Sequence, residues 1–371
     1  MKRSLLMLCL LTLTLFAVSG VIAQDDEEYM DPCLMEDMET DDMEEVPDNS
    51  DITFQIILPN ARGDRSFIDS AAKGAEDAIA MLGVDGTIIE TAGVNEHDAA
   101  IRRAAQEEPD ILITIAITED VMIEMLEEFD DQNFGVQETL FFTVDINDFP
   151  NLSLFNIDTH ENSYLTGIIA GMLSRTGKVG AVGGGDFPGI NQFIIGYQEG
   201  VVAACPDCET VISYVGGSNP FADPVRAKEI ALGMFDEGVD IIYQVAGRSG
   251  EGVLEAANET GNFAIGVDSN QDDLYPGTVI VSAMKRVDNA VFAFVENAVN
   301  DTFVSGGTTV GLAEGFAGLS WDVGVCSRTF DEFGPEDMVE KLPEVRMAVE
   351  AAYEAILAGE IEVTNALIAD E

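Results

Sequence analysis

Residues 262–289 read NFAIGVDSNQDDLYPGTVIVSAMKRVDN and contain two buried-strand patterns in close succession. The first strand runs into Asp268, and the second, TVIVSAM, presents Lys285 at its end. Short apolar strands of this kind are typical of parallel sheets, whose carboxyl edge is where α/β proteins bind polar ligands. The stretch therefore predicts one carboxylate and one ammonium group at a ligand-binding sheet edge.

The alternation of strands and helices extends in both directions from this stretch and begins near residue 52. Apolar runs of strand length alternate with segments of helical periodicity, which predicts parallel sheets with helices on both faces. About a dozen strands are too many for one sheet, so we expect two lobes. The expected strands are ITFQIIL (52–58), GTIIETA (86–92), DILITIA (110–116), TLFFTVD (139–145), LSLFNID (152–158), KVGAVGG (178–184), TVISYVGG (210–217), DIIYQVAG (240–247), NFAIGVD (262–268) and TVIVSAM (278–284).

The charge of the chain is extreme. Its 371 residues include 69 acidic and 17 basic side chains, which gives a formal net charge of −52. This balance argues against binding nucleic acid through a basic surface and against a polybasic membrane contact. A solvated acidic surface explains it, and a salty or calcium-rich environment is one cause that the sequence leaves open.

The N-terminus has the pattern of a secretory signal: basic residues 2–3, an apolar run from Leu5 to Ala23, and Val21-Ile22-Ala23 before Gln24. We expect residues 1–23 to be a signal peptide cleaved after Ala23, and the mature protein to be secreted or held at the cell surface. An uncleaved membrane anchor is the alternative, because a span needs ~20 residues. Residues 24–51 are acidic and aperiodic, which predicts a disordered tether.

Four cysteines remain after the signal segment: Cys33, Cys205, Cys208 and Cys326. An even number outside the cytoplasm predicts disulfides. Cys205 and Cys208 lack a surrounding thioredoxin pattern, so we expect them to staple a loop. A bridge between Cys33 and Cys326 follows only by elimination, and the pairing stays open. Thiols spread over the whole chain disfavour a metal site.

Three further motifs follow strands, and each has a structural alternative. In GDRSFIDSAAKG (63–74), Asp64 and Ser66 either contact a ligand or only cap the helix, and Phe67 either faces a cleft or staples the helix. In GGSNPFADPVRAKEI (216–230), Phe221 either stacks on a flat heterocycle or packs against its own lobe. In VAGRSGEG (245–252), Gly247 either lets the backbone approach a ligand or makes a turn.

Catalytic patterns do not emerge from the sequence. The glycine-rich stretch 178–189 has the wrong spacing for a dinucleotide fingerprint. His97 and His160, the only histidines, have no neighbouring nucleophile. We therefore expect no catalytic residues, no metal site and no cofactor, and we expect that the protein is not an enzyme.

The joint order of three motifs identifies a family. VAG-x-x-G-x-G at 245–252 is followed by IGVDSNQ at 265–271 and MKRVD at 284–288. With DRSFIDSAAKG and ENSYLTGIIAGMLSRTGKVGAVGG, they resemble the BMP family of substrate-binding proteins, which includes purine nucleoside receptor lipoproteins. The resemblance covers residues from about 52 to 325.

The resemblance implies a type I periplasmic-binding-protein fold, with two doubly wound parallel-sheet lobes joined by three crossings. The crossings are expected near residues 156–159, 268–271 and 312–315. Lobe 1 would comprise residues 52–156 plus 269–311, and lobe 2 residues 157–268 plus 312–371.

The resemblance also implies a function. The protein would capture a nucleoside, with purines favoured, outside the cytoplasm and deliver it, as a monomer, to the permease and ATPase of an ABC importer. A receptor domain that senses such a ligand for signalling is the alternative. An enzyme such as a nucleoside hydrolase is disfavoured because no acid–base pair is evident.

The ligand-binding residues that the resemblance implies lie on both lobes. Asp268 and Lys285 would bind ribose hydroxyls, Asp145 would accept from a purine N–H, Phe221 would stack on the base, Gly247 would approach the sugar, and Asp64, Ser66 and Phe67 would line the facing wall. The chain departs from the family at Ile68, where Asn is common, and at Ala72, where an aromatic residue is common. Phe67 or Phe187 would then have to replace that ring, and purine selectivity stays open.

Overall fold

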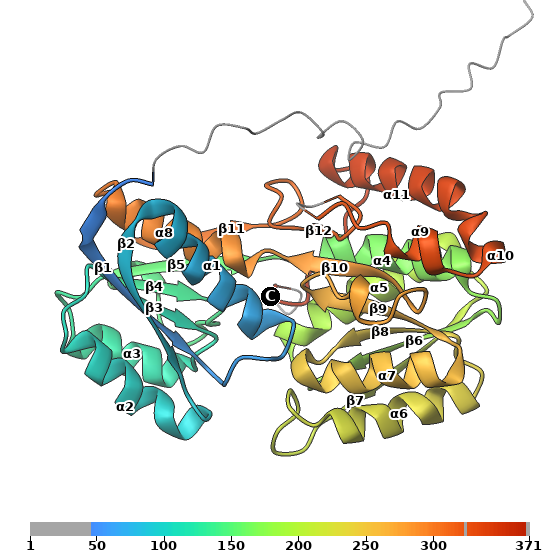
Figure 1. The fold of residues 1–371 in the computed structure, drawn as a ribbon, viewed down its shortest axis with the longest axis horizontal. Coiled ribbons are helices and arrows are strands. Elements are labelled where there is room, and N and C mark those ends of the chain that lie inside the picture. The colour runs from blue at the N-terminus through green and yellow to red at the C-terminus, as the bar shows by residue number, and fades with distance from the viewer. Residues whose placement is uncertain (1–45, 323–324, 369–371) are drawn as a thin grey trace, which may run out of the picture.

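The computed structural model describes residues 46–322 and 325–368. These residues form two lobes side by side, each built on a six-stranded sheet (Figure 1). The first sheet has the order β11-β5-β4-β3-β1-β2, with β1 Asn49–Leu58, β2 Val84–Glu90, β3 Ile111–Ile115, β4 Phe134–Gln137, β5 Leu152–Ile157 and β11 Gly306–Val310. The second has the order β12-β10-β9-β8-β6-β7, with β6 Lys178–Gly183, β7 Glu209–Tyr214, β8 Ile241–Val245, β9 Phe263–Asp268, β10 Val279–Lys285 and β12 Ala317–Leu319.

Neighbouring strands are parallel in both sheets, except that β12 runs antiparallel to β10. Helices cover both faces of each sheet. In the first lobe, α1 (Phe67–Leu82) and α8 (Val287–Val299) pack on one face, and α2 (Val94–Ala105) and α3 (Glu119–Glu128) on the other. Alternate side chains of β1 enter the two resulting cores, because successive strand residues point to opposite faces.

The second lobe repeats this arrangement. One face carries α4 (His160–Leu173), α5 (Pro188–Ala204) and α11 (Leu342–Leu357), and the other carries α6 (Pro224–Asp236) and α7 (Gly250–Thr260). Two short helices, α9 (Thr329–Phe333) and α10 (Glu336–Val339), connect β12 to α11. The expectation of two doubly wound α/β lobes is confirmed.

The chain passes between the lobes three times among the described residues. The passages lie between β5 and α4, between β10 and α8, and between β11 and β12. The expected second crossing near residues 268–271 is wrong, because β10 pairs with β9 in the second sheet and the chain leaves only at Arg286. Residues 269–285 therefore belong to the second lobe and not to the first.

The expected strand at 139–145 is also wrong. The strand that pairs with β3 and β5 is β4, the four residues FGVQ. A Cβ atom on Gly135 would lie 2.8 Å from the ring of Phe294, so α8 packs closely on this short strand. Residues 139–145 form a loop in which Phe142 is 69% exposed, although their apolar composition is that of a buried strand.

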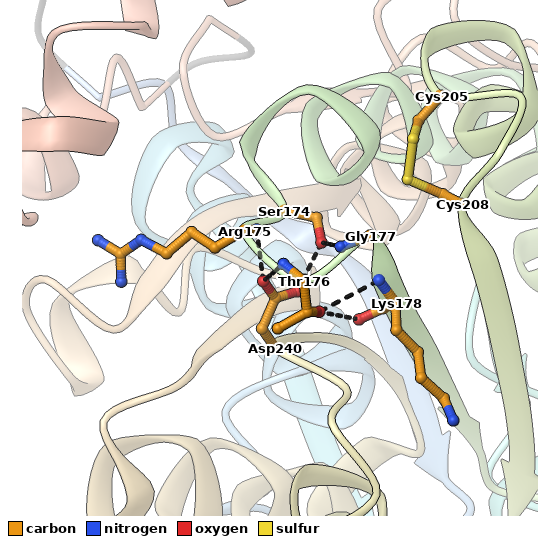
Figure 2. Close-up of a disulfide and its surroundings, with 8 residues drawn as sticks. All are labelled: Ser174, Arg175, Thr176, Gly177, Lys178, Cys205, Cys208 and Asp240. Carbon is orange, nitrogen blue, oxygen red and sulfur yellow. Dashed lines mark hydrogen bonds between the residues drawn. A yellow bond between two sulfur atoms is a disulfide. The ribbon is translucent and has the colours of Figure 1, made fainter.

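The disulfide between Cys205 and Cys208 joins the end of α5 to the start of β7, which confirms the expected loop staple (Figure 2). Near it, the carboxylate of Asp240 orders the turn after α4, because it accepts hydrogen bonds from Ser174 Oγ at 2.8 Å and from the amide nitrogens of Arg175 at 2.5 Å and Thr176 at 2.9 Å (Figure 2). Both features fix the end of the second lobe where α4, α5 and β7 meet.

Some sequence predictions lie outside the described residues. These are the signal peptide at 1–23, Cys33 and most of the tether at 24–51. The expected C-terminal boundary of the tether, residue 51, is wrong, because residues 49–51 already belong to β1. Within residues 46–322 and 325–368, no helix has the length and apolarity that a bilayer span requires.

Candidate functional site

Asp268 and Lys285 lie at the ends of two neighbouring strands of the second sheet. Asp268 ends β9 and pairs in register with Met284, so Lys285 follows at the end of β10. Both side chains are buried, with exposed fractions of 7% and 2%. Asp268 has a left-handed backbone with φ 64°. A non-glycine residue adopts this conformation at some cost in energy, and such residues cluster at functional sites.

Both groups are paired with side chains of the first lobe. Ser66, which precedes α1, donates its hydroxyl to Asp268 Oδ2 at 2.5 Å. Glu138, which follows β4, forms an ion pair with Lys285. The carboxyl ends of the two sheets therefore face one another, and four polar groups from two lobes meet between them.

Backbone contacts reinforce this meeting of the lobes. Ser269 Oγ donates to the carbonyl oxygen of Ser66 at 3.0 Å, and Gln271 Nε2 donates to that of Arg65 at 3.0 Å. Arg65 also has a positive φ, 51°. The segment before α1 is thus held against the loop after β9, which places Ser66 within reach of Asp268.

The environment of Asp268 sets its protonation. Burial raises the pKa of Asp268 to about 6, although the charge of Lys285 and the hydrogen bond from Ser66 lower it. The carboxylates of Asp64 and Glu138 contribute to the raised pKa. Ionisation of Asp268 near neutral pH therefore lowers the stability of the folded protein. A hydrogen-bond donor that binds the carboxylate stabilises its ionised form.

Aromatic rings flank the ammonium group of Lys285. Its Nζ lies 5.5 Å from the ring centroid of Phe67, at the start of α1, and 5.5 Å from that of Phe193, in α5. An ammonium group at this distance is attracted to an aromatic face. Phe67 thus lies beside the candidate pair Asp268 and Lys285, and Phe193 adds a ring that the sequence analysis did not identify.

A second aromatic pair is formed by Phe187, in the loop after β6, and Phe221, in the loop after β7. The rings of Phe221 and Phe187 meet edge to face, with centroids 6.0 Å apart. A Cβ atom on Gly184 would lie 2.2 Å from the Phe221 ring, so only glycine permits this packing. Gly247, with φ 53°, lies beside the same phenylalanine, since a Cβ atom there would be 3.6 Å from Phe221 Cβ. Phe221 thus packs on its own lobe, which is the structural alternative given above for this residue. Phe187 is 41% exposed.

Two of the expected carboxylates have other structural roles. Asp64 is buried and caps α1, because its carboxylate accepts from the amides of Ser66 at 3.1 Å, Ile68 at 2.9 Å and Asp69 at 3.0 Å. Asp145 is exposed and accepts from the amide of Asn147 at 3.0 Å, at the start of the short 3-10 helix Ile146–Asp148.

The acid at the end of β4 is Glu138 and not Asp145. Like Asp268, Glu138 has a positive φ, 66°. Gln137 Nε2 donates to Glu138 Oε2 at 2.9 Å, which leaves Oε1 for Lys285. The signal that could have found Glu138 is the short run FGVQ, which directly precedes it and follows a segment of helical periodicity at residues 121–129.

Comparison with known proteins agrees with this geometry. Residues 52–350 match the model of the PnrA-like ABC transporter substrate-binding proteins, also called Bmp. The chain belongs to this family. The family consists of binding proteins rather than enzymes, and substrate-binding proteins of ABC importers work outside the cytoplasm.

Relatives in the family come from several bacteria. Basic membrane protein D of Borreliella burgdorferi (strain JD1) is 32% identical over 273 residues, which are 72% of this chain and 78% of that protein. A CD4+ T-cell-stimulating antigen of Listeria innocua is 29% identical over 308 residues, which are 76% of this chain and 84% of that protein.

Solved structures share the architecture. The crystal structure of an ABC transporter solute-binding protein from Aeropyrum pernix K1 has a TM-score of 0.73 and 28% identity, and it covers 85% of this chain and 93% of its own. A solute-binding protein from Conexibacter woesei has a TM-score of 0.65, 23% identity, and coverage of 85% and 99%. The expected type I periplasmic-binding-protein fold is confirmed.

Proposed function

We propose that this member of the PnrA-like family binds a nucleoside between its lobes and delivers it to an ABC importer. The observation that carries the proposal is the pair Asp268 and Lys285, buried side by side at the edge of the second sheet and facing the first lobe. Ligands of open α/β sheets bind outside the carboxyl ends of the strands, which is where both groups lie.

The chemistry of the pair suits a sugar hydroxyl. A hydroxyl is both donor and acceptor, so it can donate to the Asp268 carboxylate and accept from the Lys285 ammonium group. Both bonds are charge-assisted and therefore stronger than bonds between neutral groups. The hydroxyl of Ser66, 2.5 Å from Asp268 Oδ2, has the same chemistry as the hydroxyl that a ribose would present.

The proposal includes an exchange of partners. Asp268 and Lys285 contact Ser66 and Glu138 of the facing lobe, and a ribose would take the place of at least one of these contacts. Glu138 would then be released to accept from a donor on the base. The lobes would close around the ligand by motion at the crossings, as in other two-lobed binding proteins.

Aromatic rings support a ligand with a flat base. Phe67 and Phe193 flank Lys285, and Phe221 meets Phe187 in the loops after β7 and β6. Stacking of a base on a phenyl ring contributes roughly 0.5–1.5 kcal/mol beyond the area buried. A nucleoside uses both kinds of group, whereas free ribose uses only the polar pair.

Calorimetric titration of the purified protein with inosine, guanosine, adenosine, cytidine and ribose tests the proposal. We expect saturable heat with at least one nucleoside and weaker binding of ribose. Asp268→Asn and Lys285→Met should each weaken binding by about 10- to 100-fold, the usual effect of losing a hydrogen bond to a charged group.

Asp131→Asn is the matched control, because Asp131 is exposed and the same charge is removed there. This variant should bind as the wild type does. The nucleoside proposal fails if none of the five compounds gives either heat or a shift of the melting temperature.

A further inference from the structure

Residues 359–368, which we call the C-terminal strap, follow α11 and pack along the second lobe. Gly359 reverses the chain with φ 70°. Ile361 and Val363 are half-buried and pack against the core that includes α4 and α5. The match to the family model ends at residue 350, so the strap lies outside the residues that the family model matches.

Hydrogen bonds fix the strap at one place. The amide nitrogen of Thr364 donates to Glu199 Oε2, in α5, at 3.0 Å. Asn365 Oδ1 accepts from the amide of Leu367 at 2.9 Å, which orients the side chain. Asn365 Nδ2 then donates to Asp158 Oδ2 at 3.0 Å.

Asp158 lies where two of the three crossings adjoin. It stands between the end of β5, in the first lobe, and the start of α4, in the second. Its amide nitrogen donates to the carbonyl oxygen of Val310, the last residue of β11, at 2.8 Å. A Cβ atom on Gly311, in the third crossing, would lie 3.5 Å from the Asp158 carbonyl oxygen. The bond from Asn365 thus links the strap, carried by the second lobe, to the residue that directly follows β5 of the first sheet.

The carboxylate of Asp158 interacts electrostatically with Lys285 and Glu138 of the candidate site. Burial raises the pKa of Asp158, while His160, the Asn365 hydrogen bond and Lys285 lower it and Glu138 raises it. Movement of Asp158 would therefore change the electrostatic potential at both Lys285 and Glu138.

We propose that Asn365 is a positioning residue that holds Asp158 and the adjoining crossings in the arrangement in which Ser66 and Glu138 of the first lobe meet Asp268 and Lys285 of the second, and that it thereby sets the affinity of the ligand site. Hinge residues absorb the backbone changes of lobe closure, so a side-chain bond made to one of them biases the equilibrium. Apparent affinity is proportional to the fraction of molecules in the binding-competent state. The affinity part of this inference rests on the proposed function; the effect on closure does not.

Asn365→Asp is the sharpest test, because it keeps the shape of the side chain and sets a carboxylate against the Asp158 carboxylate. We expect faster hydrogen exchange in peptides that cover residues 156–162 and 308–316, a larger radius of gyration by small-angle X-ray scattering, and ligand binding weakened by about tenfold. Deletion of residues 364–371 should act in the same direction. Asn95→Asp, at an exposed position of α2, is the control for the change in charge and should leave all three measurements unaltered.

The double variant Asp158→Asn, Asn365→Asp restores an amide–carboxylate hydrogen bond with the roles reversed. It should recover the exchange rates and the radius of gyration of the wild type. The proposal is overturned if Asn365→Asp and the deletion leave exchange and scattering unchanged, or if both change them and the double variant does not recover. If the wild type binds none of the nucleosides, the proposed function fails, and exchange and scattering still decide the role of the strap.

Discussion

Replacement of Asp268 by Asn should make the protein more stable at neutral pH while it weakens ligand binding. Asp268 is 7% exposed, and burial raises the pKa of its carboxyl group from 3.8 to about 6 in the folded protein. Asn has the shape of the protonated acid and still accepts a hydrogen bond from Ser66. The substitution therefore removes a buried charge and leaves the hydrogen-bonded geometry in place.

The size and sign of the effect follow from the two pKa values. Between pH 3.8 and about 6, the folded protein binds this proton more tightly than the unfolded chain does. The contribution of Asp268 to the free energy of unfolding therefore falls as pH rises through this window and stays low above it. Since one pKa unit corresponds to 1.36 kcal/mol, the loss is about 3 kcal/mol at pH 7. The Asp268→Asn variant avoids this loss, so it should be more stable by up to about 3 kcal/mol at pH 7 and close to wild type near pH 4.

Denaturant unfolding of both proteins at pH 4, 5, 6, 7 and 8 measures this difference. Subtracting the two curves removes the pH dependence of all other carboxylates, which a chain with 69 acidic residues makes large. Asp131→Asn, at an exposed position, is the control for the removal of one negative charge. The reasoning is refuted if Asp268→Asn destabilises the protein at pH 7, or if its effect is the same at every pH.

Three further outcomes are expected. Lys285→Met should lower the free energy of unfolding by about 3 kcal/mol, because it leaves both Glu138 and the buried Asp268 without a cation. Adding Glu138→Gln should restore part of this loss, and equal destabilisation of the single and double variants would contradict the ion pair. Raising NaCl from 0.05 to 1 M should raise the melting temperature, since salt screens the repulsion among the acidic side chains that give the net charge of −52. A falling melting temperature would show that this repulsion does not limit stability. Replacing Cys205 and Cys208 by Ser should lower the unfolding free energy by about 2 kcal/mol, as expected for a short loop, without changing ligand affinity; a loss of binding would show that the staple acts on the site.

Much of the fold is encoded in local pattern. Residues 250–260 have helical periodicity in the sequence and form α7, and α1 ends before Gly83, which takes the left-handed conformation that closes a helix. The sequence pattern did not predict secondary structure correctly where the polarity of a segment does not match its structure. The apolar run 139–145 is a loop, and the exposed, polar run GGTTV at 306–310 is the edge strand β11.

The site divides in the same way. Asp268 and Lys285 end consecutive strands that pair with each other, so their adjacency could be inferred from 28 residues of sequence, 262–289. Local pattern does not identify their partners, because Ser66 is 202 residues from Asp268 and Glu138 is 147 residues from Lys285. The family resemblance placed Ser66 on the facing wall, whereas Glu138 was not predicted. Those contacts depend on how the two lobes meet, which no local pattern records.

A crystal structure of the protein with a bound nucleoside tests the central claim most directly. We predict a ribose hydroxyl within about 3 Å of both the Asp268 carboxylate and Lys285 Nζ, in place of the Ser66 hydroxyl or the Glu138 carboxylate. A nucleoside bound elsewhere, with Asp268 still accepting from Ser66 and Lys285 still paired with Glu138, would contradict it.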